Sequence, residues 1–179
     1  MIINLVGHIA AGKSTFANWW TIKYPSWTII TIDSIRKKYP VGSEDLVWED
    51  AQKTLMNIRG HCIFESTGTI WRLKNLWNQE LVNRGIYTIK FVISPREAKM
   101  SARQRAILEG SNRYIDECYE IDLDKENQDK LCCNLIINGG ITQVNDEIYR
   151  EAEQYILRAK TVFYYNRQNI ILGQNYFKK

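Results

Sequence analysis

The sequence predicts an α/β fold, a three-layer sandwich built on a five-stranded, mostly parallel sheet. Five short runs rich in Ile and Val are almost continuously apolar, the pattern of strands that are buried on both faces of a parallel sheet. Helical patterns separate these runs, as crossover βαβ connections require. The predicted strands are residues 2–6, 27–32, 61–64, 87–93 and 134–137.

Apolar residues at three- and four-residue spacing predict the helices between the strands. The predicted helices are residues 14–22, 43–58 with Ser43 as its cap, 70–81 with Gly85 just past its end, 95–109, and 142–159 with Thr142 as its cap. The tail at residues 167–179 carries a short apolar run and two aromatic residues, and we predict an extra strand or arm there.

Length and composition fit one domain in a reducing compartment. The 179 residues suit a single domain, 1–179, with a sizeable core. The four cysteines form no CxxC pair, so we expect reduced buried thiols rather than a zinc site or a disulfide framework. No run approaches the ~18 apolar residues of a membrane span, and the N-terminus lacks the basic lead of a signal peptide. We therefore expect a cytoplasmic protein with no membrane partner.

The formal net charge of +4 fits an anionic partner such as a nucleotide or a nucleic acid, although many proteins with neither share it.

The segment GHIAAGKST, directly after the first predicted strand, satisfies G-x-x-x-x-G-K-[ST]. A loop of backbone N–H groups at a helix N-terminus supplies hydrogen-bond donors and positive partial charge for phosphates. We expect Lys13 to reach the β- and γ-phosphates of ATP and Ser14 to bind Mg²⁺. The motif predicts a P-loop NTPase and by itself leaves GTPases, motor ATPases and kinases open; the motifs described next favour the nucleoside-kinase-like fold. Its expected nucleotide-binding residues are Gly7, His8, Ile9, Ala10, Ala11, Gly12, Lys13, Ser14 and Thr15.

The two glycines of the motif have a steric interpretation. Gly7 and Gly12 let the backbone curl and approach phosphate oxygens that a Cβ would obstruct.

A candidate general base follows the second predicted strand, in the segment TIDSIR. A residue just past the carboxyl end of a parallel strand faces the ligand crevice. Asp33 is therefore placed to accept the proton of an attacking hydroxyl, with Arg36 one helical turn further on. The alternative is that Asp33 caps the helix that begins there, and both roles are compatible.

The third predicted strand ends in FESTG. Glu65 stands where an acidic residue could hold the Mg²⁺ shell or orient the acceptor, and the alternative is a structural anchor for the next loop. Trp71 follows shortly after, where it either stacks on a base or packs in the core.

Two further segments are candidates for nucleotide contacts. Arg103 and Arg105 precede a Gly/Ser/Asn-rich stretch, which predicts a lid at residues 103–113 that closes over the triphosphate. The alternative is an exposed basic helix face. Asn138 ends the last predicted strand, where it could lie along the adenine edge or simply begin a turn.

With these motifs the sequence resembles the small P-loop kinases grouped around polynucleotide 5′-kinases and zeta toxins. The matching segments are GHIAAGKST, IDSIR, FESTG, RQR and LIINGG, in order over roughly residues 1–160. The resemblance implies that Asp33 is the general base, that Arg36 helps to hold the substrate, and that Arg103 and Arg105 clasp the ATP phosphates. Zeta toxins are usually longer, and two-domain polynucleotide kinases carry a phosphatase domain that has no room here, so the resemblance leaves the acceptor open.

Together the motifs predict an ATP- and Mg²⁺-dependent kinase that phosphorylates a hydroxyl of a nucleic acid, nucleoside or nucleotide. A small-metabolite or sugar-nucleotide kinase is the alternative acceptor class. A non-kinase P-loop NTPase is the alternative from another class. The sequence lacks the N-K-x-D signature of a GTPase, and its third strand does not end in the Asp-Glu of a motor ATPase.

Overall fold

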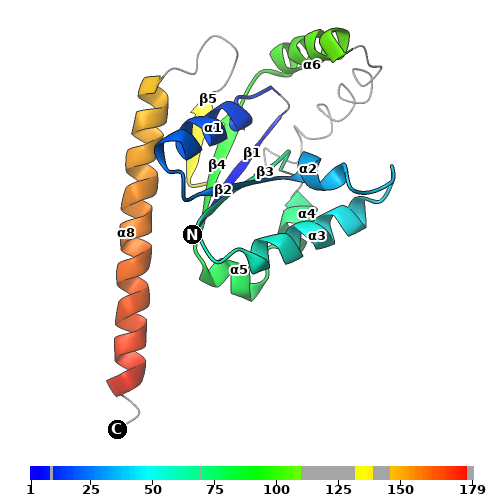
Figure 1. Ribbon diagram of the computed structural model, residues 1–179. Helices are drawn as coiled ribbons and strands as arrows, with labels where there is room; N and C mark the ends of the chain where they lie inside the picture. Colours follow the sequence, from blue (N-terminus) through cyan, green and yellow to red (C-terminus); the bar gives the residue numbers. More distant parts are fainter. Residues whose placement is uncertain (9, 69, 110–131, 139–145, 177–179) are drawn as a thin grey trace. The chain divides into compact units, whose positions relative to one another are not determined.

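The computed structural model (Figure 1) describes residues 1–8, 10–68, 70–109, 132–138 and 146–176. Its strands form one sheet in the order β2-β3-β1-β4-β5, and all four pairings are parallel. The predicted fold class and all five predicted strands are confirmed. The strands are β1 (Ile2–Gly7), β2 (Thr28–Thr31), β3 (Cys62–Ser66), β4 (Ile86–Val92) and β5 (Leu135–Asn138).

Helices make the crossovers between parallel strands. The described helices are α1 (Lys13–Lys23) between β1 and β2, α2 (Ile32–Arg36) and α3 (Glu44–Asn57) between β2 and β3, α4 (Ile70–Leu76) and α5 (Gln79–Asn83) between β3 and β4, α6 (Pro95–Glu109) after β4, and α8 (Asp146–Tyr176) after β5.

Successive strand residues point to opposite faces of the sheet, and helices cover both faces. On one face, Val6 and Phe64 lie in a buried cluster with Ala51 and Leu55 of α3 and with side chains of α4 and α5. On the other face, the Phe91 ring of β4 lies 5.8 Å from the ring of Phe16 in α1, measured between centroids. The sheet is therefore the middle of three layers.

The third predicted helix is two helices. Asn78 is the N-cap of α5, and its side chain accepts a hydrogen bond from the N–H of Leu81 at 2.9 Å. An Asn side chain that satisfies a free N–H group favours a new helix start. Leu73, Leu76 and Leu81 are nevertheless buried in the same cluster. The apolar spacing thus continues across the break, which is why it predicted one helix.

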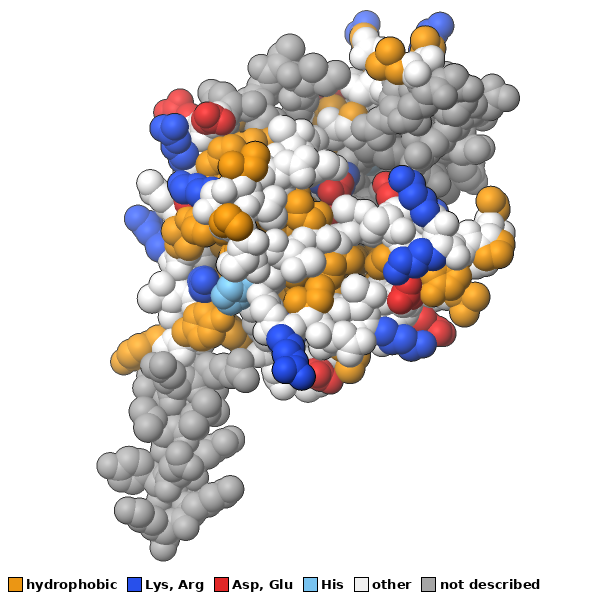
Figure 2. All heavy atoms as spheres, viewed as in Figure 1, with side chains coloured by type: hydrophobic (Ala, Val, Ile, Leu, Met, Phe, Trp, Pro, Cys, Tyr) orange, Lys and Arg blue, Asp and Glu red, His pale blue; other side chains and the backbone are white. Residues whose placement is uncertain are grey.

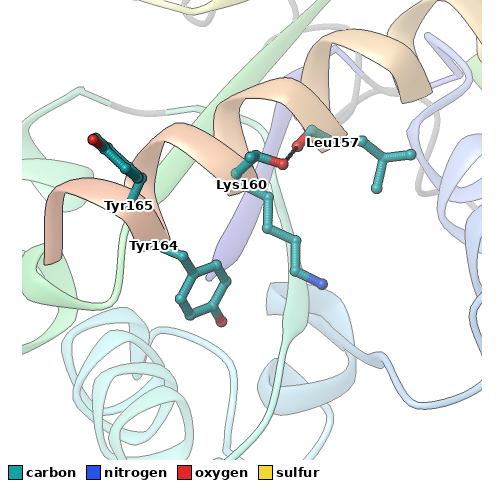
Figure 3. A pocket seen from close by; sticks show the side chains of 5 residues that line it. Leu157, Lys160, Tyr164 and Tyr165 are labelled. Atoms are coloured by element: carbon teal, nitrogen blue, oxygen red, sulfur yellow. Dashed lines mark hydrogen bonds between the residues drawn. The ribbon is translucent and has the colours of Figure 1, made fainter. Parts of the chain in front are cut away.

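α8 continues through Tyr176, so residues 167–176, for which we predicted an extra strand or arm, extend a helix instead of forming a strand. A short apolar run does not by itself distinguish the two structures. Figure 3 shows Leu157, Lys160, Tyr164 and Tyr165 projecting from α8. Among the described residues no helix is long and apolar enough to cross a membrane.

The chain divides into two compact units, Met1–Val144 and Asn145–Lys179. The single-domain organisation stays a prediction. The predicted helix cap at Thr142 lies outside the described residues.

The first glycine of the phosphate-binding motif is required by the sheet. Gly7 pairs with Phe91 of β4, its φ is +152°, and a Cβ on it would collide with the Phe91 carbonyl oxygen. The interpretation that Gly7 spares room for phosphate oxygens is therefore incomplete, because the neighbouring strand already excludes a side chain.

We expect Gly7→Ala to lower the free energy of unfolding by about 1–3 kcal/mol, the usual cost of overpacking. The measurement is a lower urea midpoint at an unchanged m-value. Gly60→Ala is the control, since a Cβ there meets nothing within 4 Å, and its change should stay within about 0.5 kcal/mol. Equal losses in the two variants would contradict the steric argument.

Candidate active site

Two backbone conformations between β1 and α1 fit the phosphate-binding loop that the sequence predicts. Ala10 (φ 62°) and Gly12 (φ 96°) both adopt left-handed conformations, which is uncommon for a residue with a Cβ. Left-handed residues within a tight loop turn successive N–H groups toward a common concavity. Gly12 is also the N-cap of α1 and offers no side-chain cap, so no side chain at this position competes with an anion for the first-turn N–H groups.

Lys13 lies over this loop. Its Nζ donates hydrogen bonds to the carbonyl oxygens of Gly7 at 2.7 Å and His8 at 2.8 Å, and the residue is only 7% exposed. The ammonium group is thus held among backbone dipoles at the place where phosphates are expected.

Ser14 and Glu65 come together across 51 residues of sequence. Ser14 Oγ donates a hydrogen bond to Glu65 Oε1 at 2.8 Å. The other carboxylate oxygen, Oε2, is buried and has no hydrogen-bond partner within the described part of the chain. A hydroxyl beside an unsatisfied carboxylate oxygen is a donor set that suits Mg²⁺, which prefers oxygen ligands and normally completes its shell with phosphate oxygens and waters. The residues therefore fit this ion.

No cluster of three or more His, Cys, Asp or Glu side chains that could hold a metal occurs within the described ranges.

Asp33 belongs to a small ionic network. Its carboxylate accepts a hydrogen bond from Arg36 Nη1 at 2.6 Å, and Arg36 Nε donates to Glu44 Oε1 at 2.5 Å. The hydrogen bond from Arg36 holds the pKa of Glu44 below its usual value, and the positive charge of Arg36 acts in the same direction, against partial burial.

The helix cap considered for Asp33 is provided by another residue. Thr31 is the N-cap of α2, and its hydroxyl accepts a hydrogen bond from the N–H of Ser34 at 3.0 Å. The Asp33 side chain is 66% exposed, so its carboxylate is accessible to a substrate.

Strand order brings these groups together. β3 lies between β2 and β1 in the sheet. Parallel strands end at a common edge, so Asp33 after β2, Glu65 at the end of β3 and the phosphate-binding loop after β1 occur side by side. The sequence predicted each strand end, but the order of the strands comes from the structure.

The remaining predicted residues are more scattered. Asn138 is exposed at the end of β5, on the opposite side of β1 from β3 and β2. Arg103 is exposed on α6, while the side chain of Arg105, residue Ile9 and the predicted lid from residue 110 onward lie outside what the structure describes. Thr15 is exposed on α1.

Sequence reasoning missed two partners. Glu44 is not among the predicted site residues, although it binds Arg36 from eight residues away. Asp45 pairs with Arg72 at 3.0 Å, and the Arg72 guanidinium carbon lies 4.0 Å from the centroid of the Trp71 ring. No sequence spacing signals a contact between two separate helices, so only the fold reveals it.

The sheet order and the loop after β1 are those of the P-loop kinase fold. No family model and no curated protein matches the sequence, but solved structures match over most of the chain.

Kti12 from Chaetomium thermophilum in complex with ADP-AlF3 is 14% identical, with a TM-score of 0.63 over 89% of this chain and 98% of that chain. Shikimate kinase from Aquifex aeolicus vf5 is 15% identical, with a TM-score of 0.55 over 90% of this chain and 99% of that chain. A chain of the Pnkp1/Rnl/Hen1 RNA repair complex is 17% identical, with a TM-score of 0.54 over 70% of this chain and 45% of that one. The protein thus has the P-loop kinase fold, and the likeness does not single out the polynucleotide kinase and zeta toxin group.

We expect Glu65→Gln to weaken Mg²⁺-dependent ATP binding by about 10-fold or more, the scale on which supporting carboxylates affect metal affinity. ATP binding without Mg²⁺ should change much less. Calorimetric titration with and without the ion makes the comparison. Glu80→Gln, the same charge change at an exposed position of α5, should leave both affinities unchanged. A loss of ATP affinity that does not depend on Mg²⁺ would make Glu65 a structural anchor instead.

Proposed function

We propose that this protein is a kinase that transfers the γ-phosphoryl group of Mg²⁺-bound ATP to a hydroxyl of a nucleic acid, nucleoside or nucleotide. The observation that carries the proposal is the adjacency of three strand ends, which supply a carboxylate with its arginine, a second carboxylate and the phosphate-binding loop. A phosphoryl transferase needs a base for the acceptor, a metal carboxylate and a phosphate cradle.

Three groups of residues bind ATP and its metal ion in this proposal. Lys13 exchanges its contacts with backbone carbonyls for the β- and γ-phosphates. Ser14 and Glu65 hold Mg²⁺, which when bound neutralises phosphate charge. Arg103 and Arg105, which the family resemblance assigns to the phosphates, are the further cationic candidates.

Asp33 acts on the acceptor. In the transfer step the acceptor hydroxyl oxygen bonds to the γ-phosphorus, and the bond from that phosphorus to the β–γ bridging oxygen breaks. ADP leaves, and the hydroxyl proton passes to the Asp33 carboxylate. Arg36 positions that carboxylate through the 2.6 Å hydrogen bond, and the family resemblance assigns it to holding the substrate.

Lys13→Ala should abolish label transfer from γ-labelled ATP to an acceptor, with the fold intact. Its charge matters most for the charge that develops in the transition state, and we expect a loss of about 10²-fold or more in kcat. The acceptor is found by screening nucleosides, nucleotides, oligonucleotides and small polyols with the wild-type protein. A variant that keeps more than about a tenth of wild-type kcat would contradict the role, since one such contact typically contributes more. Steady hydrolysis of ATP without transfer to any acceptor would favour a non-kinase NTPase.

Asp33→Asn should keep ATP affinity and lower kcat by about 10²–10⁴-fold, because an amide cannot take the hydroxyl proton. The fold should tolerate the change, since Thr31 caps α2 and exposed ion pairs contribute about 0–1 kcal/mol. Glu44→Gln is the matched control, because it removes the other carboxylate bound to Arg36 without removing the base. Steady-state kinetics with the identified acceptor give the comparison, and equal losses in both variants would reduce Asp33 to a positioning role.

A further inference from the structure

α3 and α4 enclose a groove of about 270 Å³ near the Asp33 network. This is just below the ~300–1,000 Å³ typical of ligand pockets, so the groove has room for a small ring system rather than a long chain. Its lining includes Asp45, Glu49 and Gln52 from α3, and Trp71 and Arg72 from α4.

The groove adjoins the proposed base. Glu44, which binds Arg36, is followed directly by Asp45 in the groove wall. Arg72 is close enough for its charge to contribute to the lowered pKa of Glu44, after the larger effects of Arg36. A molecule in the groove therefore lies next to the network that contains Asp33.

The groove offers an aromatic platform on a rigid support. Trp71 is 51% exposed, and the Arg72 guanidinium covers part of its ring. Gln52 Nε2 donates hydrogen bonds to the carbonyl oxygens of Asn75 at 2.9 Å and Leu76 at 2.8 Å, which ties α3 to α4. Trp48, at 8% exposed, is a core residue, so Trp71 is the ring available for stacking.

The charges at the groove are already matched. Arg72 pairs with Asp45, and Lys53 pairs with Glu49 at 4.0 Å. Next to them Arg36 binds both carboxylates of the Asp33 network. A phosphate brought into the groove would have to separate one of these pairs and face the released carboxylate. On the face shown in Figure 2, basic side chains likewise lie scattered among acidic ones instead of gathering in a single strip, and such a strip is what a polyanion needs.

The polar edge of the groove favours one kind of ring. Carboxylates such as Asp45 and Glu49 only accept hydrogen bonds. They complement a flat ring that carries N–H donors at its edge, as nucleobases do.

We propose that the groove between α3 and α4 binds the acceptor as an uncharged nucleoside, with its base stacked at Trp71, and not as a nucleic-acid strand. This inference rests on the proposed kinase function for the role of the bound molecule. The nucleoside then presents its own hydroxyl to Asp33, and the transfer step is the one given above.

The test is calorimetric titration of the full chain at low salt and without ATP. The ligands are adenosine, guanosine and cytidine, the 3′-phosphates of these nucleosides, and a single-stranded octanucleotide. We expect at least one nucleoside to bind, and its 3′-phosphate to bind about tenfold more weakly or worse, because like charges meet at the groove. Trp71→Ala should weaken nucleoside binding about 5- to 150-fold, the range of base–aromatic stacking, and Trp71→Phe should restore most of it.

A charge variant gives an independent readout. Asp45→Asn frees Arg72 from its carboxylate, so it should improve binding of the 3′-phosphate relative to the nucleoside, whereas Glu80→Gln should not. The octanucleotide binding more tightly than every nucleoside, or no effect of Trp71→Ala on nucleoside binding, would overturn the inference.

The two proposals fail separately. Label transfer to an oligonucleotide or a polyol, with no nucleoside binding, would overturn the groove assignment and leave the kinase standing. Nucleoside binding that depends on Trp71, with no label transfer to any acceptor, would support the groove and overturn the kinase assignment.

Discussion

The carboxyl end of β1 is held between two parallel neighbours, β3 and β4, whose backbones hydrogen-bond to it along its length. Every residue of β1 is buried. The buried amide of Asn4 donates a hydrogen bond to Thr88 of β4 at 3.2 Å, which gives a polar group inside the sheet a partner. At the far end, Gly7 packs against Phe91 so closely that no other residue fits without displacement. The phosphate-binding loop therefore begins from a point that two strands fix, and the position of Lys13 follows from it.

The two cationic groups near this loop, Lys13 and Arg36, have contacts of unequal strength. The ammonium of Lys13 donates hydrogen bonds to the carbonyl oxygens of Gly7 and His8, whereas charge-assisted hydrogen bonds to an anion are roughly twice as strong as neutral ones. A phosphate can therefore take over this group at a net gain. Arg36 is bound by full carboxylates but is 44% exposed, so solvent weakens that attraction, and a substrate can compete for it. The side chains of Lys13 and Arg36 are therefore held in place, but a ligand can displace their present contacts.

The sequence pattern predicts the positions of the strands because burial on both faces of a parallel sheet leaves few polar positions within each strand. The pattern does not predict a helix boundary that depends on a local side-chain contact. Asn78 is an example, because its side chain caps α5 within a continuous apolar stripe. The motif gave the place of Lys13 and Ser14. The Ser14–Glu65 contact, by contrast, depends on β3 lying next to β1, and strand order is a property of the whole sheet.

The two ends of the proposed reaction centre differ in their access to water. Lys13 is 7% exposed, whereas the Asp33 side chain is 66% exposed. Water that reaches a base beside a γ-phosphoryl group competes with the acceptor as nucleophile, so an efficient kinase must exclude it. The wall of the α3–α4 groove includes Asp45, which follows Glu44 of the Asp33 network directly. If the acceptor binds in this groove as proposed, the bound acceptor itself shields Asp33 from water, and a molecule that does not occupy the groove leaves Asp33 exposed. Selectivity of this kind comes from assembly of the site by the right acceptor rather than from tight binding alone.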